Sequence, residues 1–311
     1  MRLPSEHFGN GDDVYNMNEF KNYHPIVNFL YFVAVIAFTM IFMNPVCLAI
    51  SLVSGLVYSI MLGGAKSLRF NLVYLLPLML VTAMVNPAFS HEGVTILCYL
   101  PSGNPLTLES ILYGIAAAVM LASVICRFAC LNRVMTSDKF IYLSGRIMPS
   151  LSLVLSMVLR FVPKFKEQIK AVSDAQKCIG RDTSSGSIVQ RGKNGIKILS
   201  IMVTRSMENA IDTADSMKSR GYGLPGRTAY SNFRFNGRDV RALCYILALS
   251  ACVICGALRG GLRFRFFPDM RGEKVNFYGV LAAAAYFLLS FMPVIIEIRE
   301  EIKWKKLKSK I

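Results

Sequence analysis

One stretch of this chain combines basic side chains with glycine in a pattern that could bind an acidic partner. Residues 217–223 read Met-Lys-Ser-Arg-Gly-Tyr-Gly and follow a segment of helical periodicity. Gly221 is suited to the left-handed backbone that ends many helices, and Pro225 follows shortly after it. Lys218 and Arg220 then fall in the last turn, where the helix dipole favours cations. The pattern predicts a cationic helix tip, which either contacts a partner or is an ordinary cap.

A second stretch, whose glycine (Gly180) lies 41 residues before Gly221, resembles the first. Cys178, Ile179 and Gly180 are followed by Arg181, so a helix is again expected to end at glycine with arginine beside it. The similarity is too short to define a repeat. It nevertheless predicts two helix tips of the same kind.

The motifs of common catalytic and metal centres are missing from the sequence. Residues 63–67 (Gly-Gly-Ala-Lys-Ser) lack the GxxxxGK[ST] spacing of a phosphate loop, so the chain is not expected to hydrolyse ATP. There are three histidines and no HExxH motif. Cys252 and Cys255 have CxxC spacing, but they lie in an apolar run without a second pair. We therefore expect a protein that is not an enzyme and has no cofactor or metal site.

The composition indicates an integral membrane protein. Of the 311 residues, 54% are hydrophobic and only 17% are charged, and the mean hydropathy is +0.45. The formal net charge of +16 is interpreted as the cytoplasmic excess of Lys and Arg in such proteins. No nucleic-acid recognition module accompanies the basic residues, so nucleic acid is not an expected partner. The composition alone therefore predicts that the chain contacts the lipid bilayer.

Hydrophobic runs predict an all-α, polytopic fold with about five or six transmembrane helices and long amphipathic helices. The expected segments are a polar N-terminal segment (1–25), transmembrane helices one to four (26–135), a cytoplasmic or interfacial region (136–240), and transmembrane helices five and six with a basic tail (241–311). The individual spans are expected near 26–43, 46–62, 70–85, 110–130, 242–258 and 275–295. These spans contain almost no ionisable residues.

Loop charges predict the orientation. Loop 87–108 has no Lys or Arg, whereas the turn with Lys66 and Arg69 and the connection with Arg127, Arg133 and Lys139 are basic. Positive-inside reasoning places both termini in the cytoplasm of a multi-pass protein of the cell membrane. One segment disagrees: the turn between the last two spans is basic, yet this orientation places it outside (Arg259, Arg263, Arg265, Arg271, Lys274).

Residues 136–240 are expected to hold the amphipathic helices. The run 140–159 is predicted to be a re-entrant or interfacial helix, and 163–179 an amphipathic helix. Residues 182–195 are predicted to be a loop, followed by a second amphipathic helix over 196–219. The apolar face of this helix is expected to include Leu199, Met202, Val203, Met207, Ala210, Ala214 and Met217. Its acidic residues are expected to pair with basic ones at helical spacing (Glu208, Asp212 and Asp215 with Arg205 and Lys218).

Together these features resemble the transmembrane T component of energy-coupling-factor (ECF) transporters, of the cobalt-transport permease type. The resemblance rests on the hydrophobic spans, the two amphipathic helices and the 217–223 motif, with residues 160–163 (Arg-Phe-Val-Pro) and 175–176 (Ala-Gln) in support. It covers most of the chain from His24 onwards. In this family each coupling helix ends in an Ala-Arg-Gly-like triplet that docks on an ATPase subunit. The second triplet maps to Ser219, Arg220 and Gly221.

The first triplet departs from the family pattern. Cys178 stands for Ala, Ile179 for Arg, and Gly180 keeps the glycine. Arg181 follows and could supply the missing charge, which leaves open whether this contact is ionic or apolar. The resemblance implies that the chain transmits motion from two ABC-type ATPase subunits to a small, separate substrate-binding membrane subunit. The implied transport is uptake of vitamins or transition-metal ions, with the substrate chosen by that other subunit.

Two alternatives remain at this point. A conventional ABC-type permease would carry substrate through its own pathway, but it would be expected to have one short coupling helix and a polar cavity. A membrane-bound enzyme acting on lipid would use the basic region to hold headgroups, but it would need a nucleophile or a metal constellation. Neither set of features is visible in the sequence.

Overall fold

The chain is built almost entirely from helices, and the computed structural model describes residues 19–89, 93–99, 105–181, 187–222, 224, 233–268, 271–272 and 276–308. The N-terminal 18 residues, His91, Gly223, Pro225 and Lys274 therefore lie outside the described part, as do residues 182–186 of the predicted loop. The chain divides into two units: residues 1–136 with 233–311, and residues 137–232. The predicted all-α, polytopic membrane fold is confirmed.

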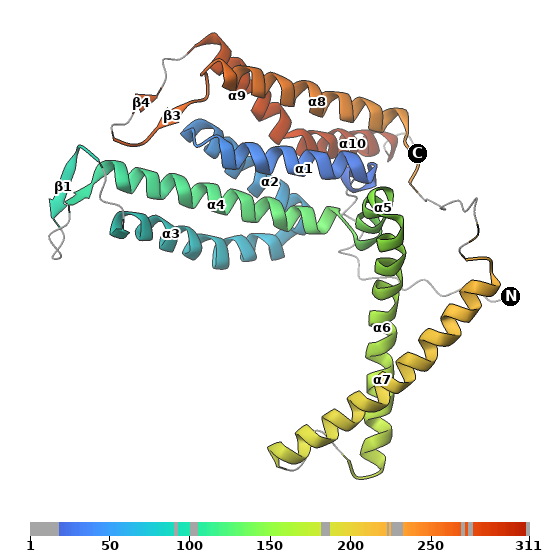
Figure 1. Cartoon of the computed structure of the whole chain (residues 1–311). Helices are drawn as coiled ribbons and strands as arrows, with labels where there is room; N and C mark the ends of the chain where they lie inside the picture. The colour runs from blue at the N-terminus through green and yellow to red at the C-terminus, as the bar shows by residue number, and fades with distance from the viewer. Residues whose placement is uncertain are drawn as a thin grey trace. The chain divides into compact units, whose positions relative to one another are not determined.

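The first unit contains seven α-helices in its described part (Figure 1): α1 (Pro25–Ile41), α2 (Pro45–Phe70), α3 (Leu76–Phe89), α4 (Leu108–Val134), α8 (Gly237–Leu258), α9 (Phe277–Ser290) and α10 (Met292–Lys308). Short turns precede α1 and α3, namely η2 (Glu19–Asn22) and η3 (Asn71–Leu75). Pro25 and Pro45 begin α1 and α2, where a missing N–H costs no hydrogen bond. Asn236 and Asp239 form a capping box at the start of α8.

Among the described residues, four helices are long and apolar enough to cross a membrane: Pro45–Ala65, Ser67–Phe89, Leu108–Val134 and Gly237–Leu258. The pair α9 and α10 meets the same test as one span bent by 52°, and α1 is a shorter apolar helix. Near the end of the first of these spans, Gly64 leaves the helical conformation, with φ +53° and ψ −142°, and the next span begins at Ser67. Five of the six predicted spans thus correspond to helices that pass this test, the last one as a bent pair, and the first predicted span corresponds to the shorter α1.

Small residues let neighbouring helices of this unit approach closely. A Cβ added at Gly114 of α4 would lie 2.7 Å from the Ala83 carbonyl oxygen of α3. On the other side of the unit, a Cβ at Gly256 of α8 would lie 2.5 Å from the Cβ of Ala282 in α9. Contacts of this kind are typical of helices that pack within a bilayer, where lipid tails are as apolar as the side chains.

Two small hairpins lie together at one end of the first unit (Figure 1). One pairs β1 (Ile96–Tyr99) with β2 (Pro105–Thr107), and the other pairs β3 (Phe264–Arg265) with β4 (Arg271–Gly272), both antiparallel. The rings of Phe266 and Phe267 pack against Tyr113 in the second turn of α4, with ring centroids 5.5 and 5.2 Å away. The basic turn that disagreed with the positive-inside pattern therefore lies at the same end as loop 87–108.

We expect the two hairpins to face the outside of the cell and the end of α10 to face the cytoplasm. On a cysteine-free background, Tyr99→Cys and Arg265→Cys should react with an impermeant thiol reagent in intact cells, since both positions are exposed. Leu307→Cys, also exposed, should react only after permeabilisation. Labelling of position 307 together with protection of 99 and 265 would show that the orientation is inverted. Labelling of 99 with protection of 265 would show that one crossing is missing.

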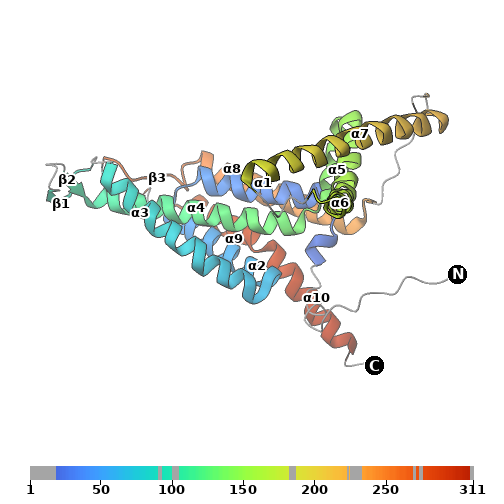
Figure 2. The same cartoon turned by 90° about the horizontal axis from the view of Figure 1, so that it is seen from below.

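The second unit consists of α5 (Ser137–Ile147), α6 (Pro149–Cys178) and α7 (Ile188–Ser219). Both views show α6 and α7 crossing one another (Figures 1 and 2). Phe165 and Val172 of α6 pack there with Ile198, Ile201 and Met202 of α7. This small core joins the two long helices past the middle of α6 and before the middle of α7.

The predicted boundaries of the helices before α7 are wrong in two places. The predicted helix over 140–159 is broken before Pro149, because a residue that precedes proline is disfavoured in the helical region; Met148 has φ −137° and ψ 89°. Pro163, predicted to begin a helix, instead lies inside α6, which runs through it. Proline removes one backbone hydrogen bond there without ending the helix.

The helix α7 begins earlier than predicted. Residues 188–195, assigned to a loop for their glycines, are helical. Asn194 is buried in this turn and Ile198 packs against α6. Tertiary packing thus outweighs the low helix propensity of Gly192 and Gly195, which costs about 1 kcal/mol each.

Candidate coupling site at the ends of two helices

The C-terminal end of α7 is closed by a left-handed glycine. Gly221 has φ +81°, and its N–H donates to the carbonyl oxygen of Lys218 at 3.0 Å. The N–H of Tyr222 donates to the carbonyl oxygen of Met217, also at 3.0 Å. These two bonds define a Schellman motif, which satisfies carbonyl groups that the helix leaves free. The predicted glycine stop at Gly221 is confirmed.

The end of α6 has the same geometry. Gly180 has φ +77°, and its N–H donates to the Lys177 carbonyl oxygen at 3.0 Å. The N–H of Arg181 donates to the Gln176 carbonyl oxygen at 3.0 Å. The capping residues also agree: Ile179 has φ −92° and ψ 10°, and Arg220 has φ −84° and ψ 7°. The predicted glycine stop at Gly180 is therefore confirmed as well.

This common backbone aligns the two triplets position by position. Cys178 matches Ser219 in the last helical residue, and Ile179 matches Arg220 at the cap. Gly180 matches Gly221, and Arg181 takes the place that Tyr222 occupies after the glycine. Arg181 is thus two backbone positions away from the site of the arginine in the other tip. The side chain at the cap of the α6 tip is apolar.

Both tips are available for contact in this chain. Ile179 is 66% exposed, and the side chains of Arg181, Ser219 and Arg220 are exposed too. The two views agree that the C-terminal end of α7 lies away from the C-terminal end of α6, because the helices cross one another before reaching these ends (Figures 1 and 2). The unit therefore presents two separate contact points instead of one composite site.

The ion pairs predicted along α7 are absent from the described structure. Glu208, Asp212 and Asp215 are exposed, as are Arg205 and Lys218, but no ion pair joins any of them within the part of the chain that is described. Correct sequence spacing is not sufficient here, because ordering two long exposed side chains costs about as much as the pair gains in water. The charges of this surface remain open to solvent.

The same Arg-Gly capping geometry also occurs at the end of a third helix, so it is not specific to the two tips. The end of α8 has Arg259 at the cap, with φ −83° and ψ 9°, followed by Gly260 with φ +86°. The guanidinium of Arg259, however, lies over the ring of Tyr278, 4.4 Å from its centroid. Arg220 has no ion pair or ring contact within the described residues. An Arg-Gly helix end is thus a recurrent cap, and what distinguishes the α7 tip is a guanidinium that makes no ion pair or ring contact with the part of the chain that the structure describes.

The helix α7 also presents a second apolar stripe that the described residues do not cover. Ile196, Leu199, Val203 and Met207 recur at helical spacing and are 70%, 62%, 51% and 65% exposed. Met202, predicted to share their face, is 6% exposed because it belongs to the opposite side, packed on α6. The single predicted face is therefore two faces. The uncovered one is the kind of surface that marks an interaction site.

The family model for CbiQ, described as cobalt transport protein, matches residues 17–230 of this chain. The chain belongs to this family. The match includes both helix tips and the crossing of α6 and α7.

Curated proteins named energy-coupling factor transporter transmembrane protein EcfT are similar to part of this CbiQ-family chain. The protein from Lactobacillus helveticus is 36% identical over 100 residues, which is 32% of this chain and 36% of its own length. The protein from Streptococcus thermophilus is 38% identical over 100 residues, 32% and 38% of the two chains. The protein from Bacillus subtilis is 31% identical over 102 residues, 32% and 38% of the two chains. This chain therefore matches less than half the length of these relatives.

Arg127 does not lie where the sequence predicts it. We predicted it in a cytoplasmic connection and expected almost no ionisable residues in the spans, but Arg127 lies within α4 and is fully buried. Its Nη1 donates to Tyr31 Oη of α1 at 2.8 Å and to the Ser290 carbonyl oxygen of α9 at 3.5 Å. Its Nη2 donates to Ser54 Oγ of α2. One side chain thus joins four helices of this CbiQ-family protein.

The hydroxyl groups around Arg127 extend the polar cluster. Tyr31 Oη donates to the Ser290 carbonyl oxygen at 3.0 Å, and Ser54 Oγ donates to the Ile50 carbonyl oxygen at 2.7 Å. No carboxylate pairs with Arg127 in the described residues. The signal that could have revealed the buried position of Arg127 is the apolar sequence on both sides of it. Leu131 and Val134 extend the apolar helix beyond Arg127, so the span does not end there. An ionisable residue in such a run is expected to be functional or to bind other helices.

Proposed function

We propose that this chain is the transmembrane coupling subunit of an ABC-type ECF importer. It would transmit the conformational change of two ATPase subunits to a separate, small, substrate-binding membrane subunit. The observation that carries the proposal is the pair of exposed helix tips with one shared backbone geometry, in a chain of the CbiQ family. The names of the EcfT relatives support a coupling subunit over a self-contained permease or a lipid-acting enzyme.

The coupling contacts are assigned to the residues of the two triplets. In the α7 tip, Arg220 is the residue that would meet a carboxylate, since guanidinium groups form strong, often bidentate bonds with that group. In the α6 tip, Ile179 occupies the equivalent cap and would bury apolar surface in its ATPase subunit. Full burial of a side chain of this size contributes about 1.5–3 kcal/mol. The two ATPase grooves would therefore differ in chemistry, one acidic and one apolar.

The proposed location is the cell membrane, with both termini and both tips in the cytoplasm. ATP would bind only to the other subunits, because this chain lacks a phosphate-loop motif. The substrate class would be vitamins or transition-metal ions, and the family description favours a metal ion such as cobalt. The substrate would be chosen by the partner subunit, so this chain by itself is expected to bind neither.

Purification from native membranes tests this proposal. The tagged chain should bring with it two related ATPase subunits and a small membrane protein, and this complex should hydrolyse ATP. The chain purified alone should have no ATPase activity. Hydrolysis that persists in the isolated chain after removal of every contaminating ATPase would contradict the proposal. So would uptake of substrate by vesicles that contain this chain and ATPases but no third subunit.

A further inference from the structure

A groove with a volume of about 890 Å³ lies in the first unit between α8 and α10. It is found at the end of the unit opposite the two hairpins (Figure 1), where the span α8 begins and the chain approaches its C-terminus. Tyr23, just before α1, contributes to its lining. The groove is distinct from the helix tips and from the Arg127 cluster, neither of which lines it.

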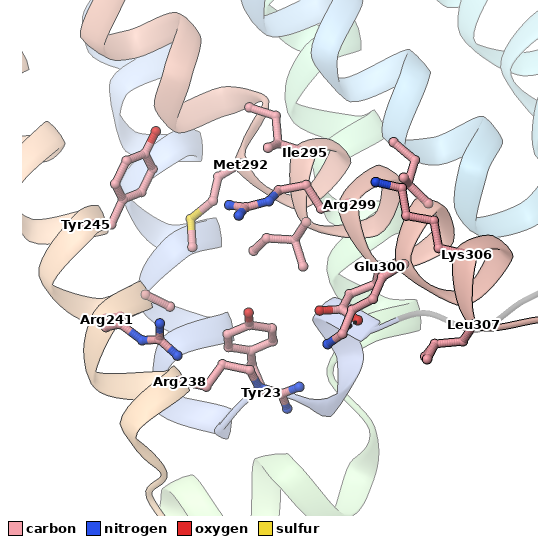
Figure 3. A pocket seen from close by; sticks show the side chains of 14 residues that line it. Tyr23, Arg238, Arg241, Tyr245, Met292, Ile295, Arg299, Glu300, Lys306 and Leu307 are labelled. Carbon is pink, nitrogen blue, oxygen red and sulfur yellow. Dashed lines mark hydrogen bonds and ion pairs between the residues drawn. The ribbon is translucent and has the colours of Figure 1, made fainter. Parts of the chain in front are cut away.

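The groove combines an apolar floor with a basic rim. Ala242 and Met292 are buried in the floor, and Ile295 and Ile296 continue it along α10. The rim has five cationic side chains (Arg238, Arg241, Arg299, Lys303, Lys306) and one carboxylate, Glu300. Figure 3 shows the guanidinium groups of Arg241 and Arg299 pointing from opposite helices into the space between them.

Part of this positive charge is already neutralised, and part is available. Arg238 lies 3.5 Å from Glu19 and stacks on the ring of Tyr23, 4.5 Å from the centroid. Lys303 lies 3.5 Å from Glu300. Arg241 has only a 3.4 Å bond from Nε to the Gly237 carbonyl oxygen, and Arg299 has no ion pair among the described residues. The two arginines that face one another are therefore the available cations of the groove.

The position of the groove matches the boundary of the bilayer. Arg238 and Arg241 are in the first turns of a helix that is long and apolar enough to span a membrane. Beyond them, Leu247 and Ile254 of the same helix are 53% and 46% exposed, as expected for a lipid-facing surface. Along α10, the apolar residues Ile302 and Leu307 alternate with the basic rim and are about half exposed. This is the pattern of a helix at the level of the headgroups.

We propose that this groove binds one anionic phospholipid of the cytoplasmic leaflet. Its phosphate lies between Arg241 and Arg299, and one acyl chain lies on Met292 and Ile295 and continues along α8 into the bilayer. A free anion would use the two guanidinium groups but not the apolar floor. An acidic peptide would use the rim but would leave the floor and the lipid-facing residues of α8 without a partner. Basic pockets between helices at the cytoplasmic side are known to select anionic headgroups for this reason.

The only tryptophan of the chain allows this site to be observed directly. Trp304 lies on α10, next to the groove residue Lys303, and is 44% exposed. The full chain would be reconstituted in vesicles of dioleoyl phosphatidylcholine with increasing brominated phosphatidylglycerol, or with brominated phosphatidylcholine at the same fraction. We expect the phosphatidylglycerol probe to quench Trp304 fluorescence saturably at low mole fraction, whereas the phosphatidylcholine probe should quench only in proportion to its abundance.

Two matched double variants give the test its specificity. Arg241→Gln with Arg299→Gln should weaken the apparent affinity for phosphatidylglycerol about 25-fold, because each surface cation contributes roughly a factor of five to the affinity. Arg263→Gln with Arg265→Gln removes the same charge from the hairpin at the other end and should leave the quenching unchanged. Arg241→Lys with Arg299→Lys should retain most of the preference. Size-exclusion profiles would show that each variant is folded.

Four outcomes would overturn the proposal. Equal quenching by the two brominated lipids would show that the headgroup is not selected. Equal losses in the two Gln double variants would indicate general attraction of lipid to a basic protein. Relief of the quenching by millimolar inorganic phosphate would assign the groove to a free anion. Relief by a poly-glutamate peptide, with no relief by phosphate, would assign it to a protein partner.

Discussion

Arg220→Glu should abolish capture of the ATPase subunits while the protein still accumulates in the membrane. Arg220 caps α7 with an exposed side chain, so the substitution costs only the helix-dipole term of about 0.3–1 kcal/mol in folding. At a docked tip, however, a glutamate would meet the proposed carboxylate with water excluded. The loss of a buried charge pair costs about 2–5 kcal/mol, which corresponds to a loss of affinity of more than tenfold. Pull-down from detergent-solubilised membranes, together with uptake assays, measures the effect.

Arg259→Glu is the matched control for this experiment. It makes the same charge change at a helix end of nearly identical backbone geometry, at the cost of the contact with Tyr278. Because α8 ends at the hairpin side of the first unit, ATPase capture should be normal. Ile179→Glu should reduce capture as strongly as Arg220→Glu, because it puts a charge where the α6 tip is proposed to bury an apolar side chain. Arg181→Glu should reduce capture less.

Undiminished capture and uptake by Arg220→Glu would show that the 217–223 motif is only a helix cap. A larger effect of Arg181→Glu than of Ile179→Glu would show that the first contact is ionic after all. The assignment of the α6 tip would then move from the cap to the residue after the glycine.

Arg127→Ala should destabilise the first unit by about 3 kcal/mol or more. The substitution removes a fully buried side chain and leaves a cavity among α1, α2, α4 and α9, and truncations of large core residues cost about 2–5 kcal/mol. It also removes donors that bond Tyr31, Ser54 and the Ser290 carbonyl oxygen. Thermal unfolding of the purified protein in detergent, followed through fluorescence size-exclusion, should show a lower midpoint.

Two further substitutions separate volume from hydrogen bonding at this position. Arg127→Met keeps most of the volume and should recover part of the stability. Arg127→Lys keeps the charge, but an ammonium group lacks the planar fork of the guanidinium and cannot reach all three acceptors. The unfolding midpoint of this variant should therefore be lower than that of the wild type. Arg133→Ala, near the end of the same helix, should have little effect on the midpoint. An unchanged midpoint for Arg127→Ala would show that the cluster does not hold the helices together.

The sequence was sufficient for the parts of this fold that depend on local rules. Left-handed glycines such as Gly180 and Gly221 end helices because they lack a Cβ, and this holds in any surroundings. The start of α7 was missed because Gly192 and Gly195 favour a loop, whereas the packing of Ile198 against α6 favours a helix. The burial of Arg127 was missed because a hydropathy profile counts the arginine as polar and takes no account of the groups that would bind it inside the protein. The hydroxyl groups that bind it come from residues far away in sequence.

The off-centre crossing of the two long helices has a mechanical consequence. The 32 residues of α7 measure about 48 Å at 1.5 Å per residue. The contact with α6 is centred between Ile198 and Met202, which leaves about 29 Å of helix toward the Arg220 tip and about 18 Å toward Ile188. A rigid rod that rotates about this fulcrum moves its short arm about 0.6 times as far as its long arm, and in the opposite direction. If α7 turned in this way, a displacement of the Arg220 tip would reappear at the Ile188 end with a smaller amplitude and a larger force.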